Sequence, residues 1–180
     1  GIAAVQIGKL LGARVIAAAS TAEKREFAQA HGADAAIDYT QAGWRDTFKE
    51  LTGGHGADVI FDPVGGEISV QAFRSIAWRG RHLVIGFADG QIPALPWNLP
   101  LLKGASIVGV FWGDFVRREP AANARMLGVL ASQYARGAIK PVIDGVLPLS
   151  RLAEAYRRLE QRQILGKLVM VPDELLEAAH

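Results

Sequence analysis

Cysteine is missing altogether from this chain of 180 residues, which excludes disulfides, thiolate metal sites and cysteine nucleophiles. An excess of one charge is missing too, because 20 Lys and Arg stand against 18 Asp and Glu and leave a formal net charge of +2. The isoelectric point of about 9.1 lies so high only because few groups titrate just above neutral pH. The weak field at neutral pH predicts neither a nucleic-acid partner nor a membrane partner.

Long apolar runs are the third absence. Lys9, Arg14 and several glycines interrupt the most hydrophobic stretches well before the roughly 20 residues that a membrane-spanning helix needs. The chain opens on Gly1 with no signal-peptide pattern, so we expect a cytoplasmic protein. What the sequence does contain is a 50% hydrophobic, glycine-rich composition, and its length fits one domain of roughly 100–200 residues.

Short apolar runs alternate with helix-length segments along the chain. Ser20 and Glu23 have the spacing of a capping box, and Gly32 stands where that helix would end. The prolines of residues 88–100 predict an extended loop, and residues 173–180 are expected to be a frayed terminus. The pattern predicts helices over residues 1–11, 20–31, 44–51, 67–77, 119–136 and 150–163, and strands over 14–19, 35–38, 57–62, 81–85, 105–111, 142–147 and 167–171. Such alternation indicates βαβ units and therefore an α/β fold with a doubly wound parallel sheet.

Ligands of doubly wound folds bind beyond the carboxyl ends of the strands, so the residues after each strand are the candidate site. Gly1 stands at the start of an apolar helix, where the last glycine of a Gly-x-Gly-x-x-Gly fingerprint would fall. The strand and turn that open such a fingerprint are not in the sequence, so we expect a Rossmann domain that lacks its first strand. A glycine left by cloning before an ordinary helix would explain the same residue.

The end of the strand over residues 14–19 favours NADP over NAD. NAD sites place an Asp or Glu there to bind the ribose 2′-hydroxyl, whereas NADP sites replace the acid with groups that bind a 2′-phosphate. Here the positions hold Ser20, Thr21, Lys24 and Arg25. A helix cap at Ser20 and a solvated Lys24 would explain those two residues, but not the missing acid. An S-adenosylmethionine methyltransferase shares the sheet but needs an acid at this place, so Ser20 argues against it.

No catalytic acid or nucleophile is recognisable in the sequence. It contains neither His-Glu-x-x-His nor Gly-x-Ser-x-Gly. The histidines His31, His55, His82 and His180 lack the spacing of metal ligands, and we expect each of them at the surface or at a helix end.

Strings that span nearly the whole chain resemble the quinone oxidoreductase branch of the medium-chain dehydrogenase/reductase superfamily. In order they are GIAAVQIGKLLGARVIAAAS, then Glu-Lys, HGADAAIDYT, GADVIFDPVGG, GRHLVIGFADG, ASIVGVFWG and IKPVIDGVLPLSRLAEAYRRLEQRQILGKLVM. The resemblance implies zinc-independent hydride transfer from NADPH to a small-molecule substrate, a quinone or a conjugated carbonyl compound (enone). Residues 1–137 would be the NAD(P)-binding Rossmann domain. Residues 138–180 would return to a GroES-like catalytic domain that the sequence lacks, so the chain alone would be inactive.

The same resemblance implies which residues contact the cofactor. Ser20 and Lys24 would bind the 2′-phosphate, and Tyr39 would lie against the adenosine. Residues after the next two strands would line the channel toward the nicotinamide, and backbone groups of residues 111–113 would bind its carboxamide. The complete set is Gly1, Ile2, Ser20, Thr21, Lys24, Tyr39, Pro63, Val64, Gly86, Phe87, Ala88, Phe111, Trp112, Gly113, Arg162 and Lys167.

Several alternatives remain open at this point. Phe87 and Phe111 are also typical of a core, and Arg162 of a solvated helix face shared with Arg151 and Arg158. The family and the apolar segment over residues 105–110 together predict a homodimer formed through the last sheet strand, since a bare apolar edge is prone to pair. A non-catalytic dinucleotide-binding module or redox sensor is the alternative to an enzyme.

Overall fold

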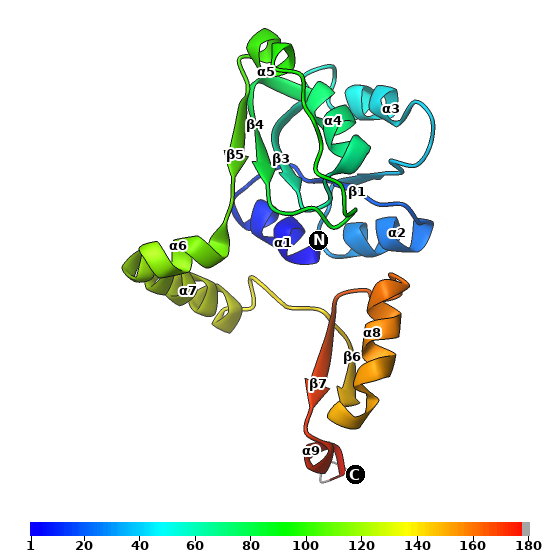
Figure 1. Cartoon of the computed structure of the whole chain (residues 1–180), viewed down its shortest axis with the longest axis vertical. Coiled ribbons are helices and arrows are strands. Elements are labelled where there is room, and N and C mark those ends of the chain that lie inside the picture. Colours follow the sequence, from blue (N-terminus) through cyan, green and yellow to red (C-terminus); the bar gives the residue numbers. More distant parts are fainter. Residues whose placement is uncertain (178–180) are drawn as a thin grey trace.

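The computed structural model describes residues 1–177 and shows strands and helices in alternation (Figure 1). The helices are α1 (Ile2–Leu10), α2 (Ala22–Ala30), α3 (Trp44–Leu51), α4 (Gly66–Arg74), α5 (Asn98–Lys103), α6 (Trp112–Arg118), α7 (Pro120–Ala135), α8 (Leu152–Glu160) and α9 (Asp173–Glu177), with a 3-10 turn η1 (Leu149–Arg151) before α8. The strands are β1 (Ile16–Ala18), β2 (Ala35–Ile37), β3 (Ala57–Asp62), β4 (Ile76–Val84), β5 (Ser106–Gly109), β6 (Ile143–Pro148) and β7 (Lys167–Val171).

All strand pairs in the described part of the chain are parallel, which confirms the predicted α/β fold class. Strand β1 pairs with β2, strands β3, β4 and β5 form a second ladder in that order, and β6 pairs with β7. No ladder joins β1 to β3 within residues 1–177. In the strand order of a dinucleotide-binding sheet, this break is the place of the first strand.

The buried core lies between the strands and the helices that connect them. One cluster is formed by Val5, Ala28 and Ala33, and a second by Ile37, Trp44 and Phe48. In α3 the spacing of its two buried aromatic side chains places both on one helix face, and that face packs against β2. Burial of these apolar faces stabilises the crossover helices against the sheet.

The boundary between α4 and β4 differs from the prediction. A helix was expected over residues 67–77 and a strand only from residue 81, but α4 ends at Arg74 and β4 begins at Ile76. Ile76 and Ala77 are each 1% exposed, and Ile76 pairs with Ala57. Arg79 adopts a positive φ of 61° next to an irregularity in this pairing. The burial of Ile76 and Ala77 and the pairing of Ile76 with β3 therefore outweigh the helix-like pattern of the sequence at these two residues.

Helices α5 and α6 were missed because their surroundings look like loop. Pro100 lies in the first turn of α5, where a proline's missing N–H costs no helical hydrogen bond. Ion pairs on its own surface stabilise helix α6, since Asp114 accepts hydrogen bonds from Arg117 and Arg118. The predicted strand over residues 105–111 is accordingly shorter. Helix α9 replaces part of the expected frayed terminus, and residues 178–180 lie outside the described residues.

The C-terminal unit of β6, α8 and β7 extends away from strands β1–β5, as does the pair of α6 and α7 (Figure 1). A two-way hydrogen bond ties this unit to α1. The Gln6 side-chain amide donates to the Lys140 carbonyl (2.9 Å), and the Lys140 amide donates to Gln6 Oε1 (3.1 Å). This pair of hydrogen bonds lies at the start of the C-terminal segment, close to the end of the proposed dinucleotide-binding domain.

Candidate functional site

The predicted site residues gather mainly where strands β1–β5 end. All five segments that follow these strands contain predicted contacts, at residues 20–21, 39, 63–64, 86–88 and 111–113. The carboxyl ends of parallel strands form one edge of a sheet, which is where such folds bind their ligands. Topology therefore brings together residues that are widely separated in the sequence.

Gly1 caps the amino end of α1 at this edge. Its carbonyl accepts hydrogen bonds from the Ala4 amide (3.0 Å) and the Val5 amide (3.2 Å). A Cβ added at Gly1 would meet no atom within 4 Å, so the helix end opens into free space. The first amides of a helix point outward and favour an anion, and Ile2 lies in this first turn.

Lys167, at the start of β7, lies near this same helix end. The pKa of the Gly1 amino group is below its ordinary value, first because the group is partly buried and second because the positive charge of Lys167 acts on it. Two predicted contacts, Gly1 and Lys167, therefore lie near one region. The positive end of the helix dipole and the Lys167 ammonium both favour a negatively charged ligand there.

The loop after β1 separates the roles of two neighbouring cations. The Arg25 guanidinium pairs with Asp38 (2.8 Å) and donates to the Ala19 carbonyl (3.1 Å), so it is already engaged. No carboxylate pairs with the side chain of Lys24 in the part of the chain that the structure describes. Hydrogen bonds from Thr40, with a further contribution from Arg25, hold the pKa of Asp38 below its usual range.

The cap of α2 corrects one expectation. Thr21, not Ser20, is the N-cap, and its Oγ1 accepts a hydrogen bond from the Lys24 amide (3.3 Å). The half-buried hydroxyl of Ser20 is therefore not used by the helix cap. Tyr39, after β2, is half-buried and packs against the core cluster that contains Ile37.

The loops after β3 and β4 form one connected surface. Four backbone hydrogen bonds join them: Ile85 to the Asp62 carbonyl (2.9 Å), Ala88 to Pro63 (3.1 Å), Asp89 to Val64 (2.9 Å) and Gly66 to Gln91 (3.0 Å). The predicted channel residues Pro63, Val64, Gly86, Phe87 and Ala88 are consequently held next to one another. Their relative placement depends on backbone rather than on flexible side chains.

A buried polar network lies beneath this surface, and the sequence did not reveal it. Asp62 Oδ1 accepts from the amides of Val64 (2.9 Å) and Gly65 (3.1 Å), while Oδ2 faces His82 Nε2 at 3.1 Å. Ser69 Oγ lies 3.4 Å from the same imidazole nitrogen. Burial alone would raise the pKa of Asp62, but the hydrogen bonds from His82, Ser69 and the loop amides outweigh it and hold the pKa far below its usual range.

This network corrects the expectation that every histidine lies at the surface or at a helix end. His82 is 3% exposed in the middle of the β3–β4–β5 ladder. His31, at the end of α2, and the exposed His55 do fit the expectation, and His180 lies outside the described residues. A signal for Asp62 was present, because it ends a strand directly before Pro-Val-Gly-Gly. No local pattern connects it with His82.

Aromatic side chains after β4 and β5 are exposed, which excludes the core as their explanation. Phe87 is 40% exposed, Phe111 77% and Trp112 59%. Gly113 is also exposed, in the first turn of α6. Arg162 follows α8 with a positive φ of 56° and is exposed, so a place on a solvated face still accounts for it.

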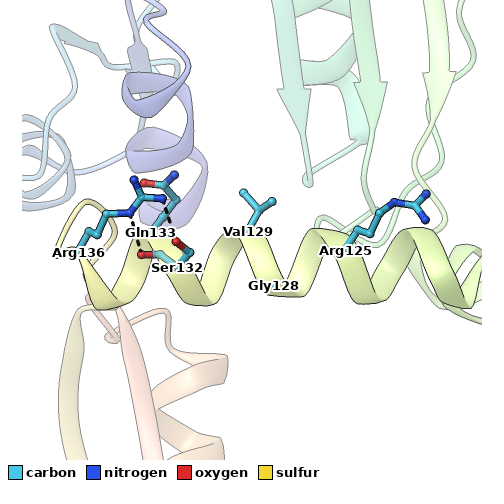
Figure 2. Close-up of a pocket in the computed structure, with 6 residues that line it drawn as sticks. All are labelled: Arg125, Gly128, Val129, Ser132, Gln133 and Arg136. Atoms are coloured by element: carbon cyan, nitrogen blue, oxygen red, sulfur yellow. Dashed lines mark hydrogen bonds between the residues drawn. The ribbon is translucent and has the colours of Figure 1, made fainter.

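Two hollows in the described chain lie elsewhere. One, of about 490 Å³, runs along α7, and the other, of about 640 Å³, lies between α1 and residues 137–143. Figure 2 shows the first, whose lining residues are Arg125, Gly128, Val129, Ser132, Gln133 and Arg136. Neither hollow contains a predicted contact residue.

Residues 1–177 contain neither a cluster of metal ligands nor a helix that could cross a membrane. No three His, Asp or Glu side chains converge as a metal site would require. Among the helices described, none combines the length and the apolar character needed to cross a membrane.

Residues 1–135 match the family described as zinc-binding dehydrogenase. The chain belongs to this family. Quinone oxidoreductase-like protein 2 homolog of Nematostella vectensis is 38% identical over 172 residues, which is 94% of this chain and 47% of that protein. The dehydrogenase match and these relatives confirm the predicted place in the quinone oxidoreductase branch.

Solved structures share the fold of this chain. A structure described as an NAD-dependent alcohol dehydrogenase is 35% identical, with a TM-score of 0.80, and the match covers 94% of this chain and 47% of that one. The quinone oxidoreductase of Escherichia coli, crystallised in complex with NADPH, is 25% identical, with a TM-score of 0.85, over 96% of this chain and 53% of that one. The chain therefore spans about half the length of the relatives that it matches.

Proposed function

We propose that this chain is the NADPH-binding part of an oxidoreductase that passes hydride to a quinone or a conjugated carbonyl compound. The observation that carries the proposal is the arrangement after β1, where Lys24 stands without a carboxylate partner in residues 1–177 and the loop holds Ala19, Ser20 and Thr21 rather than an acid. Asp38, the nearest acid after β2, is taken up by Arg25. A cation beside the Ser20 hydroxyl, which the helix cap does not use, suits a 2′-phosphate.

The rest of the edge fits the same cofactor. The open helix end at Gly1 and the ammonium of Lys167 would hold the pyrophosphate region, since both favour negative charge. The joined loops at Pro63 and Phe87 would position the nicotinamide half, and the backbone near Phe111 would bind its carboxamide. When bound, NADPH supplies the hydride, while this chain supplies binding, orientation and exclusion of water.

Titration of the chain with NADPH and NADH, followed by nicotinamide fluorescence, tests the proposal. We expect tighter binding of NADPH, and we expect Lys24→Glu to weaken NADPH about 10- to 100-fold while NADH changes little, because one charge-assisted contact contributes about 1.5–3 kcal/mol. Lys49→Glu, an exposed lysine in α3, is the matched control for the charge change. Equal affinities of the unaltered chain for the two cofactors would overturn the NADPH assignment.

The reaction itself requires the protein at the full length of its relatives. We propose that residues 1–137 bind the dinucleotide, that residues 138–180 belong to the catalytic domain of that longer protein, and that the reaction needs no zinc. A panel of quinones and enones with NADPH, repeated after treatment with a metal chelator, tests substrate class and zinc together. Turnover of none of these compounds would favour a non-catalytic role, and loss of turnover on chelation would refute zinc independence.

Strand β5 supports a homodimer in our proposal. It is the last strand of its ladder, and Ile107, Val108 and Val110 are 43%, 37% and 40% exposed. An apolar edge with unpaired backbone groups favours pairing with a second copy. Sedimentation of the chain at micromolar concentration as a dimer would support this assembly, and sedimentation as a monomer would contradict it.

A further inference from the structure

The buried network of Asp62, His82 and Ser69 joins three elements below the site. Asp62 is the last residue of β3, His82 lies in β4 opposite Ile60, and Ser69 lies in α4. The side chains of His82 and Asp62 are only 4% and 10% exposed. Buried polar groups that are not needed to close a ladder or cap a helix require a reason for being there.

The two carboxylate oxygens of Asp62 face in different directions. Oδ1 accepts from the amides of Val64 and Gly65, and Oδ2 faces His82 Nε2. Rotation of the carboxylate would break both sets of contacts, so His82 determines where Oδ1 can hold the loop. Gly65 adopts φ 74° and ψ −150°, a region that glycine alone enters readily, so the hydrogen bonds to Asp62 select one of several backbone shapes open to this loop.

The protonation of the His82 ring follows from its surroundings. Nδ1 is buried and has no hydrogen-bond partner among residues 1–177, whereas Nε2 faces Asp62 at 3.1 Å. A proton on Nδ1 would leave an N–H group buried and unpaired, which costs about 1–3 kcal/mol. The proton therefore belongs on Nε2, which donates to Asp62. The Phe73 ring, with its centroid 5.8 Å from that of His82, packs against the imidazole.

We propose that Asp62 and His82, with Ser69 beside them, are positioning residues that hold the loop Pro63–Gly65 in the shape that receives the nicotinamide half of the cofactor. The proposal rests on the proposed NADPH function. It assigns no chemical step to these residues, which act through the loop and through Phe87, whose own loop is bonded to Pro63 and Val64 by backbone hydrogen bonds.

The first test compares two ligands on the whole chain: NADPH, and adenosine 2′,5′-bisphosphate, which lacks the nicotinamide half. We expect Asp62→Asn and His82→Phe to weaken NADPH about tenfold or more and to leave the bisphosphate within about twofold. The chain offers a matched control pair, His55 and Asp58, whose Nε2 and Oδ1 atoms are 2.8 Å apart but exposed on the surface. His55→Phe and Asp58→Asn should change neither affinity.

Equal weakening of both ligands by the buried substitutions would overturn the proposal, because it would mean a general loss of folding. Ser69→Ala, the mildest change, keeps the test usable if the other variants fail to fold, and should weaken NADPH selectively but less. If the unaltered chain binds neither ligand, the NADPH function itself fails. The second test, described next, needs no bound cofactor and still shows whether Asp62 and His82 hold the loop.

The second test is nitrogen NMR of the imidazole together with exchange of the loop amides. In the unaltered chain we expect the proton on Nε2 and slow exchange at the amides of Val64 and Gly65. In Asp62→Asn the amide oxygen must still accept from the loop, so its NH₂ group faces His82 and should move the ring proton to Nδ1. A proton on Nδ1 in the unaltered chain, or loop amides that exchange equally fast with and without His82→Phe, would refute the network's role.

Discussion

Gly65→Ala should destabilise the protein and deform the site at once. Gly65 is buried, with φ 74°, at the junction of the loops after β3 and β4. An added Cβ would lie 2.8 Å from Phe87 Cδ1 and 2.9 Å from the Gln91 carbonyl oxygen. The second of these atoms is backbone, and the neighbouring Gly66 amide bonds to it, so neither side of the contact can easily move.

The magnitude has two parts. A non-glycine residue in this backbone region costs about 1–3 kcal/mol, and inserting a methyl group into a packed place costs about 1–3 kcal/mol more. We therefore expect Gly65→Ala to lower the free energy of unfolding by about 2–6 kcal/mol, a large part of the roughly 5–15 kcal/mol that a domain has.

Urea denaturation followed by tryptophan fluorescence measures this loss. Gly90→Ala is the control, because Gly90 shares the positive φ (83°) but has no atom within 4 Å of an added Cβ. It should lose only about 1–2 kcal/mol from the backbone conformation. If Gly65→Ala lost no more than Gly90→Ala, the argument that the loops meet tightly at Gly65 would be refuted.

Three further predictions concern burial, pH and salt. Phe73→Ala should lower the free energy of unfolding by about 3–5 kcal/mol, since Phe73 is 1% exposed, while Phe111→Ala, at 77% exposed, should lose under about 1 kcal/mol in the same urea titration. Because the pKa of Asp62 is lowered in the fold, the contribution of its carboxylate to the free energy of unfolding is present above an unfolded pKa of about 3.9 and is lost as the pH falls below that value. The difference in the free energy of unfolding between the unaltered chain and Asp62→Asn should therefore narrow from pH 7 toward about pH 3. A constant difference would contradict this pKa linkage. Added salt should weaken NADPH binding more in the unaltered chain than in Lys24→Glu, measured by fluorescence titration, and parallel salt slopes would argue against a contact of Lys24 with phosphate.

Local signals predicted most of the fold. The alternation of short apolar runs with helical segments is visible within a few residues, and it predicted the parallel α/β class and the order of the strands. Errors arose where local and distant contacts compete. Ile76 is compatible with the end of a helix, and only its pairing with Ala57 makes it a strand residue.

The candidate site divides in the same way. The order of the elements predicted where the site lies, because parallel strands bring their carboxyl ends to one edge, whereas most of its individual residues came from the family resemblance. Which cation stays available there was beyond the sequence: Lys24 and Arg25 are neighbours, and only the position of Asp38 decides that Arg25 is the engaged one. The choice of Thr21 over Ser20 as helix cap depended on a single backbone conformation.

The sequence by itself determined the fold class, the family and the edge at which the site lies, because periodicity, strand-end residues and extended matching strings are properties of neighbours along the chain. Only the tertiary structure decided that Asp62 and His82 meet in a buried network below that edge. Helix α4 and the first part of β4 separate the two residues in the sequence, and they meet because β3 and β4 lie side by side in parallel, with α4 packed against them. No local sequence preference of either residue predicts that contact.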